Sequence, residues 1–392
     1  MTANTALVRA VASVCAPGTD AEALATVLAW ACGPRRRPDT LRRRLRDSGH
    51  HADADAAAQL LAAVAVDGPI GEVVRRVALR VVTTWQRLDA RVALVGDPAY
   101  PAALATGWPY VDAPVFLVWR GHPPGATGPG VALVGARNAS AYGRTVTEHL
   151  ATAVSQAGAR VVSGGAMGID AAAHCAALRR PGGTTVVLGC GHAVRYPAPH
   201  ARPGGLFDDV LQHGGTLVSE LFPEVTAHPG VIRARNRIVA GLSKVTVVVE
   251  GGSRSGALLT ATAALDRGRE VFAVPGDMLA PGSAAPLRLL SEGARVCTGA
   301  HDLLAALPEL ARAPSVEATD RSGTDAGGVV PSEIARLLAG AGARGLSIDE
   351  LARASTQDTG ALLGMLVRAR VAGVVEDVPG GVRLRQTRST VR

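Results

Sequence analysis

The chain has 392 residues, which is more than one ordinary hydrophobic core holds, so we expect two or three domains. Apolar residues make up 47% of it, but charges and glycines interrupt every apolar run, so we expect no membrane partner. The net charge of +8 at pH 7 suits a polyanionic partner such as a nucleic acid. Almost all the basic residues are arginines in an alanine-rich chain, as is typical of a GC-rich genome, so arginine clusters inform more than the total.

The five cysteines are dispersed and form no CxxC pair, which argues against a disulfide framework and against a zinc site. We therefore expect reduced thiols, no metal and no cofactor. The N-terminal segment lacks the basic region that begins a secretory signal peptide. Together these features predict a cytoplasmic protein.

Residues 1–90 are predicted to form an α-helical, SAM-like domain. Apolar residues recur at helical spacing through this range, and glycines and prolines separate the helices. The segment Arg35–Arg46 contains seven arginines and one aspartate. Such a segment is either a solvated helix face or a nucleic-acid contact patch, and the sequence leaves both open.

Residues 91–311 predict an α/β domain with an extended Rossmann-like fold, in which a doubly wound parallel sheet alternates with helices. An edge strand is expected at Val115–Trp119. Short β-branched runs then predict six strands, at residues 131–135, 160–163, 184–189, 215–219, 244–250 and 271–275. Helical spacing predicts helices at residues 140–157, 169–179, 203–213, 232–242, 256–267 and 300–311.

Residues 312–329 are polar and glycine-rich, which predicts a flexible linker. Residues 330–392 follow the order of a winged-helix domain, with three short helices and a hairpin. Ser347 and Glu350 form a capping box, and Pro379–Gly381 predicts the hairpin turn. Such a domain binds DNA or serves as a protein adaptor, and the sequence does not decide between the two.

Two glycine loops follow the first two predicted strands of the parallel sheet. The first loop contains Gly135, Arg137 and Ser140, and Ser140 is placed to cap the next helix. The second loop supplies five further candidates for phosphate binding: Ser163, Gly164, Gly165, Met167 and Gly168. Glycine lets the backbone approach a ligand closely, and a helix N-terminus attracts anions, so both loops predict a phosphate site.

The second loop differs from a dinucleotide-binding loop. Its glycines are spaced GGxxG, and no acidic residue ends the next strand to hold a ribose hydroxyl, so we expect no NAD site. Asp170 is placed to cap the helix that begins at Ala171. His174 follows one turn later, where a buried structural histidine and a catalytic one are both open.

Later loops supply the remaining candidates. Arg195 is a cation and Tyr196 is an aromatic ring suited to stacking, and both follow the third strand. A basic motif and a second glycine-rich loop near Glu250 contribute five more: Arg235, Asn236, Arg237, Ser255 and Gly256. No nucleophile–base pair, paired carboxylates or P-loop motif stands out, so the predicted crevice binds phosphates and is not expected to be enzymatic.

Five stretches together resemble the DNA-processing protein A family, also called Smf. They are VALVGARNASAYG, VVSGGAMGIDAAAH, the Tyr196-Pro197 loop, RARNRIVAGLS with VVVEGGSRSGALLTA, and VFAVPGD. The resemblance implies a single-stranded-DNA-binding protein that forms a homodimer. It also implies that the protein protects DNA and loads the recombinase RecA onto it during natural transformation or recombination. By the same resemblance, Arg137, the Gly164–Gly168 loop and Arg195 would line the DNA pocket.

The chain departs from the family pattern at a few positions. Ile232 replaces the usual phenylalanine near the RNR motif. After VPGD and Ser283, the chain has Ala285 and Leu287 where many members carry glycine and a polar residue. We therefore expect a ligand-facing position to have become apolar, which would alter the far wall of the pocket or the dimer surface.

Two other functions remain open. Related Rossmann folds that resemble lysine-decarboxylase-like phosphoribohydrolases carry PGGxGTxxE, but here Pro181–Gly183 runs into threonines without the catalytic glutamate. A nucleotide sensor that signals through the winged helix is the other alternative, because one phosphate site can hold a free nucleotide or a strand.

Overall fold

The computed structural model divides the chain into two compact units, residues 1–313 and 314–392. It describes residues 3–33, 38–47, 56–106, 112–126, 128–312, 332–341 and 345–355. It also describes residues 362, 365–366, 369, 374–378 and 381–384. The two units are treated separately below.

The first unit is built on a nine-stranded sheet with the order β1-β2-β6-β5-β4-β3-β7-β8-β9. Seven neighbouring strands, from β6 to β9 in that order, run parallel, and β2 pairs antiparallel with both β6 and β1. The strands are β1 (Arg91–Leu94), β2 (Phe116–Gly121), β3 (Gly130–Val134), β4 (Arg160–Ser163), β5 (Thr184–Val187), β6 (Thr216–Ser219), β7 (Val245–Val248), β8 (Glu270–Ala273) and β9 (Arg295–Val296).

The six strands predicted for the parallel sheet correspond to β3 through β8, so the α/β class with a mostly parallel sheet is confirmed. The expected edge strand is wrong in one respect. It corresponds to β2, but β1 pairs with its outer side and forms the edge instead. β1 and β9 were not predicted, because β1 lies outside the regular alternation of strands and helices from which β3 to β8 were predicted and β9 has only two residues.

Helices cover both faces of the sheet because successive strand residues point to opposite sides. On one face, Val131 and Leu133 pack with α7 (Ala141–Gln156), α8 (Ile169–Ala177) and α15 (Ala300–Ala305). On the other, Ala132 and Val134 belong to a core that includes residues of α6 (Ala102–Ala105), α12 (Asn236–Gly241), α13 (Gly256–Leu265) and α14 (Ala284–Ser291).

Several helix boundaries differ from the sequence prediction. The helix expected at 232–242 is two helices, α11 (Pro229–Ala234) and α12, which meet at Arg235. The helix expected at 203–213 begins later, as α10 (Leu206–Gln212), after the short α9 (Ala198–Ala201). Pro308 divides the last predicted helix into α15 and α16 (Pro308–Arg312), since proline has no N–H to continue a helix. A 3₁₀ turn, η1 (Pro281–Ser283), precedes α14.

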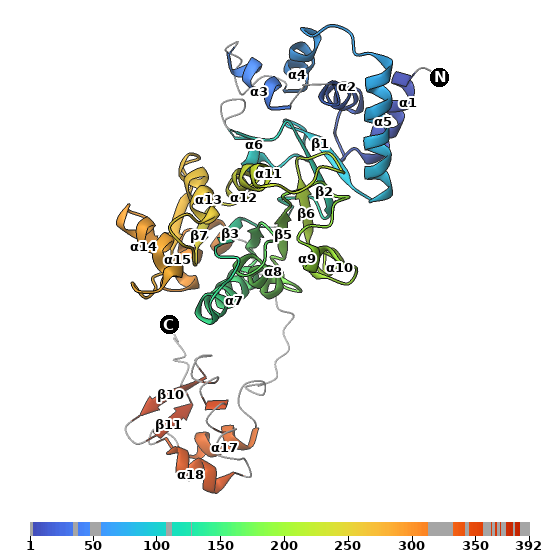
Figure 1. Cartoon of the computed structure of the whole chain (residues 1–392). Coiled ribbons are helices and arrows are strands. Elements are labelled where there is room, and N and C mark those ends of the chain that lie inside the picture. The colour runs from blue at the N-terminus through green and yellow to red at the C-terminus, as the bar shows by residue number, and fades with distance from the viewer. Residues whose placement is uncertain are drawn as a thin grey trace. The chain divides into compact units, whose positions relative to one another are not determined.

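The N-terminal helices lie next to β1 and β2 at one end of this unit (blue in Figure 1). They are α1 (Ala3–Val14), α2 (Ala21–Ala31), α3 (Pro38–Asp47), α4 (Ala56–Ala65) and α5 (Glu72–Arg87). Trp30 and Trp85 belong to the same buried cluster as Phe116 of β2. Because this core is continuous with the sheet, a domain boundary at residue 90 stays a prediction.

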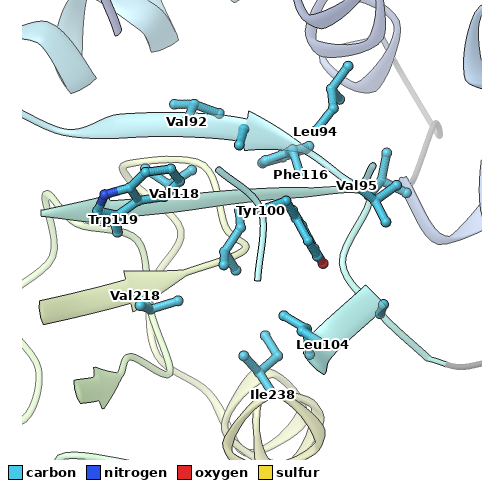
Figure 2. Close-up of a cluster of buried hydrophobic side chains, with 14 of the residues drawn as sticks. Val92, Leu94, Val95, Tyr100, Leu104, Phe116, Val118, Trp119, Val218 and Ile238 are labelled. Carbon is cyan, nitrogen blue, oxygen red and sulfur yellow. The ribbon is translucent and has the colours of Figure 1, made fainter. Parts of the chain in front are cut away.

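Figure 2 shows how β1 and β2 join the sheet to the helices. Val92 and Leu94 of β1 lie beside Phe116 and Val118 of β2, and all four are almost fully buried. The hydroxyl group of nearby Tyr100 donates a hydrogen bond to the carbonyl oxygen of Pro114 (2.8 Å), which satisfies the polar end of a buried ring.

The second unit contains α17 (Ser332–Ala341), α18 (Ile348–Ala354) and a hairpin of β10 (Val375–Val378) and β11 (Gly381–Leu384). The predicted capping box is present, since the Ser347 hydroxyl and the Glu350 carboxylate each accept a backbone hydrogen bond of the other residue. The predicted linker beyond Arg312, the Pro379-Gly380 turn, and most of the third helix lie outside the described residues. The winged-helix assignment therefore stays a prediction.

Candidate nucleic-acid interface

The point where the sheet changes winding direction locates the candidate site. From β3 the chain proceeds through β4, β5 and β6 to one side, and then returns to place β7, β8 and β9 on the other. The loops after β3 and β7 therefore diverge at the carboxyl edge of the sheet. Ligands of doubly wound folds bind in the crevice at this topological switch point.

A cavity of about 970 Å³ lies at this edge, and we call it the main cavity. It is lined by the loops after β3 and β4, by α11 and α12, and by the beginning of α13. Eight of the residues predicted from the sequence line it: Gly135, Arg137, Gly164, Tyr196, Arg235, Asn236, Ser255 and Gly256.

The lining of the main cavity is strongly basic. It contains five arginines, at positions 137, 233, 235, 254 and 288, against the two carboxylates of Asp170 and Glu292. Arg137, Arg233 and Arg254 are exposed and form no ion pair with any residue that the structure describes. Arg288 forms an exposed ion pair with Glu292 (2.8 Å). The cavity therefore presents unpaired guanidinium groups, which suit phosphate oxygens.

Arg235 forms the floor of the main cavity and is only 7% exposed. Its Nη1 atom donates a hydrogen bond to the carbonyl oxygen of Val187 (2.9 Å), while its Nε atom has no hydrogen-bond partner in the described chain. Burial lowers the pKa of this guanidinium, and the nearby Asp170 carboxylate opposes that shift. A Cβ atom at Gly164 would lie 1.5 Å from Nη1, so only glycine fits beneath Arg235.

The loop after β4 uses two of its backbone donors within the chain. The Asp170 carboxylate accepts hydrogen bonds from the N–H groups of Gly164 (3.1 Å) and Ala166 (3.2 Å), so these two groups are not free for a ligand. Asp170 is not the helix cap, since α8 begins at Ile169, directly after Gly168. The predicted capping role is therefore wrong.

The second glycine-rich loop is also satisfied from within the chain. The buried carboxylate of Glu250 accepts hydrogen bonds from the N–H (2.9 Å) and the hydroxyl group of Ser140. Ser140 in turn caps α7 as predicted, accepting from Gly143 N–H. The Ser255 side chain caps α13, and Asn236 Nδ2 donates to the carbonyl oxygen of Gly256 (3.1 Å). These residues build the cavity wall through mutual hydrogen bonds.

Arg237 lies outside the main cavity and has a different role. Its guanidinium forms ion pairs with Glu220 (2.6 Å) and with Asp112 (2.9 Å). Burial opposes its charge, but the two carboxylates outweigh this and raise the pKa of Arg237. It therefore joins α12 to the end of β6 and to the segment before β2, and no donor faces the cavity in that arrangement.

Four residues of the glycine loop after β4 are not part of the cavity lining. Ser163 is buried and donates its hydroxyl group to the carbonyl oxygen of Leu133 (2.6 Å). Gly165 is buried, and its carbonyl oxygen contacts a ring nitrogen of His200 (2.9 Å). Met167 is 44% exposed, and Gly168 has a positive φ of 80° at the start of α8. The structure thus assigns this loop mainly to shaping the turn.

Arg195 and Tyr196 are separated although they are neighbours in the chain. Tyr196 lines the main cavity, and the Tyr196-Pro197 peptide bond is cis. Arg195 lines another cavity of about 330 Å³, which we call the second cavity. The two side chains therefore do not belong to one pocket.

Sequence analysis did not select four of the polar residues that line the main cavity: Arg233, Arg254, Arg288 and His228. Arg233 and Arg254 lie inside quoted motifs, so their charge was the available signal. Ile232, the position that departs from the family, does line the cavity. Ala285 is fully buried, and neither it nor Leu287 is among the residues that line the main cavity, so the expectation of an altered ligand-facing position there stays a prediction.

Two further expectations concern catalysis and metals. His174 is fully buried, Nδ1 contacts the Thr184 hydroxyl group (2.7 Å), and burial lowers its pKa to about 3. It is thus a neutral structural histidine. Among the residues described, no cluster of three or more His, Cys, Asp or Glu side chains could hold a metal. In the same part of the chain, every helix is too short or too polar to cross a membrane.

Comparison with known proteins gives consistent matches. The family model described as DNA recombination-mediator protein A matches residues 91–308. The chain is 35% identical over 231 residues to the DNA processing protein DprA of Bacillus subtilis, covering 59% of this chain and 75% of that protein. It is 37% identical over 261 residues to Protein Smf of Escherichia coli, covering 65% and 68% respectively.

A solved structure is also similar. The X-ray structure of DNA processing protein A from Streptococcus pneumoniae matches with a TM-score of 0.54 and 29% identity, covering 68% of this chain and 92% of that chain. The residues that the family model matches, 91–308, include strands β1 to β9 and all residues that line the main cavity.

Proposed function

The chain belongs to the DNA recombination-mediator protein A family, and from that premise we propose that it binds single-stranded DNA in the main cavity. One observation carries the proposal: three exposed arginines without ion pairs in the described chain, Arg137, Arg233 and Arg254, surround a large cavity at the switch point. Phosphate contacts dominate the affinity of proteins for nucleic acids and carry little sequence information.

The main cavity suits a single strand because it combines cations with an aromatic ring. Tyr196 is half-buried in its wall and offers a surface on which a base can stack, which every base can do. Leu258 and Leu259 add apolar area on α13. We therefore expect binding with weak sequence preference and strong dependence on salt.

The proposed cellular role follows from the family. The protein would protect processed or incoming DNA and load the recombinase RecA onto it, in recombination or natural transformation. It would act as a homodimer. Strand β9 is the free edge of the described sheet and carries the exposed apolar Val296 (49%), so it offers a surface on which a second copy can pair.

The hydrolase alternative receives no support from the fold. The motif that suggested it, Pro181–Gly183, immediately precedes β5 and therefore lies at the amino edge of the parallel sheet, opposite the main cavity. The nucleotide-sensor alternative uses the same cavity. It differs from the proposal only in the ligand, so a binding measurement with both ligands separates them.

The experiment is a fluorescence-anisotropy titration of oligothymidylate of about 35 nucleotides at about 50 mM and 200 mM salt. We expect salt-sensitive binding by the wild-type chain and about a tenfold weaker affinity, or about 1.4 kcal/mol, for Arg137→Ala. Arg80→Ala is the matched control, because Arg80 is an exposed arginine on α5 that lines neither cavity. Absence of wild-type binding at low salt would overturn the proposal and favour a free nucleotide as ligand.

A further inference from the structure

The second cavity is lined by Arg195, the chain neighbour of Tyr196, which lines the main cavity. Its lining is contributed by β2, by the segment after β5, by the region around α9 and α10, and by the end of α5. The lining residues that carry the argument are polar: Arg120, His192, Arg195 and Asp208.

Arg120 and Arg195 are unpaired cations at this cavity. Neither guanidinium forms a hydrogen bond or an ion pair with any residue that the structure describes. Arg120 is half-buried on β2, and burial lowers the pKa of its guanidinium while Asp208 opposes that shift. The Asp208 carboxylate itself accepts from the N–H of Gly204 (2.8 Å). Removing a charged guanidinium from water without an ionic partner raises the free energy of the folded protein, and a bound anion would offset that increase.

His192 also lines the second cavity. It is 7% exposed, and its Nε2 atom lies 3.2 Å from the carbonyl oxygen of Val118, so Nε2 carries the hydrogen in this contact. Its Nδ1 atom is buried and has no partner in the described chain. Burial lowers the pKa of His192 to about 4, so the ring is neutral at pH 7 and Nδ1 is an acceptor.

We propose that the second cavity binds a phosphate group, with Arg120 and Arg195 as its ligands. Because Arg195 and Tyr196 are consecutive, one loop contributes to the lining of both cavities. A strand that leaves the main cavity past Tyr196 would reach the second cavity directly. The phosphate is therefore either the next part of the bound strand or that of a free nucleotide.

If the phosphate belongs to a bound DNA strand, this proposal rests on the proposed function. The test therefore distinguishes a DNA strand from a free nucleotide as the ligand of the second cavity. We would compare the full-length wild-type chain with the double variant Arg120→Ala/Arg195→Ala and with the single variant Arg195→Glu. The single variant changes an exposed side chain and so guards against loss of folding. The double variant Arg76→Ala/Arg80→Ala is the charge-matched control, since α5 carries these arginines on its exposed face.

Each protein would be titrated with oligothymidylates of about 6 and about 20 nucleotides, and with dTMP by calorimetry. For a strand, we expect about a tenfold loss of affinity for the longer oligomer and less than about a twofold change for the shorter one. For a free nucleotide, both oligomer affinities stay unchanged and a wild-type dTMP binding event disappears.

Two results would overturn the proposal. One is that neither the longer oligomer nor dTMP binds more weakly to the Arg120 and Arg195 variants. The other is that the control variant loses as much affinity as they do, because general charge would then explain the effect. If the wild-type chain binds neither oligomer, the proposed function fails, and the dTMP titration alone decides this proposal.

Discussion

At the floor of the main cavity a buried guanidinium covers a glycine, and this contact leaves no space for a side chain at position 164. The Arg235 side chain is held there by its hydrogen bond to Val187 and by close packing. Its direction sets the depth of the cavity. Since Arg137 also faces this cavity, the two like charges are separated only because Arg235 is held below the surface.

This contact leads to a first prediction, for Gly164→Ala. The added Cβ atom forces Arg235 out of place, and we expect a loss of about 1–3 kcal/mol, seen as a decrease of roughly 2–6 °C in thermal midpoint. Gly256→Ala is the control, because a Cβ there meets nothing closer than 3.9 Å and should leave the midpoint unchanged. Equal thermal midpoints for Gly164→Ala and Gly256→Ala would show that Arg235 can move away from position 164 without loss of stability.

A second prediction separates two arginines of one motif. Arg237→Ala leaves the half-buried carboxylate of Glu220 without its partner and should cost about 1–3 kcal/mol of unfolding free energy. Arg233→Ala should leave stability unchanged and weaken binding of single-stranded DNA several-fold, because Arg233 is exposed at the main cavity. Urea unfolding and anisotropy titrations measure the two effects. A loss of stability in Arg233→Ala, together with a loss of affinity but not of stability in Arg237→Ala, would contradict these two roles.

A third prediction concerns pH. The pKa of His174 falls from its usual 6.5 to about 3 in the folded chain, so below pH 6.5 the unfolded chain binds a proton that the folded chain does not. Stability should therefore decrease as the pH falls, by up to about 1.4 kcal/mol per pH unit. Between pH 7 and pH 5, His174→Gln should lose about 2 kcal/mol less than the wild type. Identical pH dependence of urea unfolding would contradict this.

The sequence identified the candidate residues but not their partners. Glu250 and Ser140 are 110 residues apart, and only the folded sheet brings the carboxylate to the helix N-terminus. Asp170 could likewise be placed near a helix start, but its acceptance of loop N–H groups depends on the turn geometry. The three-dimensional structure was therefore needed to tell which polar loop residues face the cavity and which form hydrogen bonds within the protein.

Among the elements, α3 shows how an arginine cluster can serve the fold. Arg42 pairs with Asp112 (3.2 Å), which also pairs with Arg237. Arg44 forms two hydrogen bonds with the Asp67 carboxylate, which also accepts from the Trp30 indole N–H (2.7 Å). These pairs tie α3 to neighbouring helices and to the sheet. This structural role applies to Arg42 and Arg44. Arg43 and Arg46 are exposed, and Arg35–Arg37 lie outside the described residues, so the solvated face and the nucleic-acid patch both stay open for them.

A fourth prediction follows from these ion pairs. Arg44→Ala should reduce the unfolding free energy by about 1–2 kcal/mol, because it removes a charge-assisted pair and leaves Asp67 partly buried. Affinity for single-stranded DNA should change less than about twofold. Arg46→Ala is the control: its pair with Asp47 is exposed and should contribute less than about 0.5 kcal/mol. A large affinity loss in Arg44→Ala would support the nucleic-acid patch instead.

Element type followed the sequence where short apolar strands alternate regularly with helices. The strands β3 to β8 were predictable from this alternation, although most of them have only four residues, and α7, α8 and α13 were predictable with them. β1 lies outside the alternation, β9 has only two residues, and the eight residues of α14 include Pro286, so these elements were not predicted. Tertiary pairing decides such segments.

At the scale of the whole molecule, the sequence motifs predicted a site at the carboxyl edge of the sheet. The strand order explains why the loops that carry these motifs lie close together. The chain winds outward from β3 in both directions, so loops far apart in sequence meet at one cavity. The sequence could not show the second cavity. Arg120 lies on an antiparallel strand whose position beside β6 was unknown before the sheet order was determined.

The central claim is that single-stranded DNA occupies the main cavity, and ultraviolet crosslinking with peptide mapping tests it most directly. The full chain would be bound to oligothymidylate, irradiated, digested and analysed by mass spectrometry. We predict crosslinks in peptides that contain Tyr196, Arg137 and the Arg233–Asn236 segment, and a lower crosslinking yield in Arg137→Ala at a protein concentration near the wild-type dissociation constant. Crosslinks confined to residues 332–384, unchanged by that substitution, would contradict the claim.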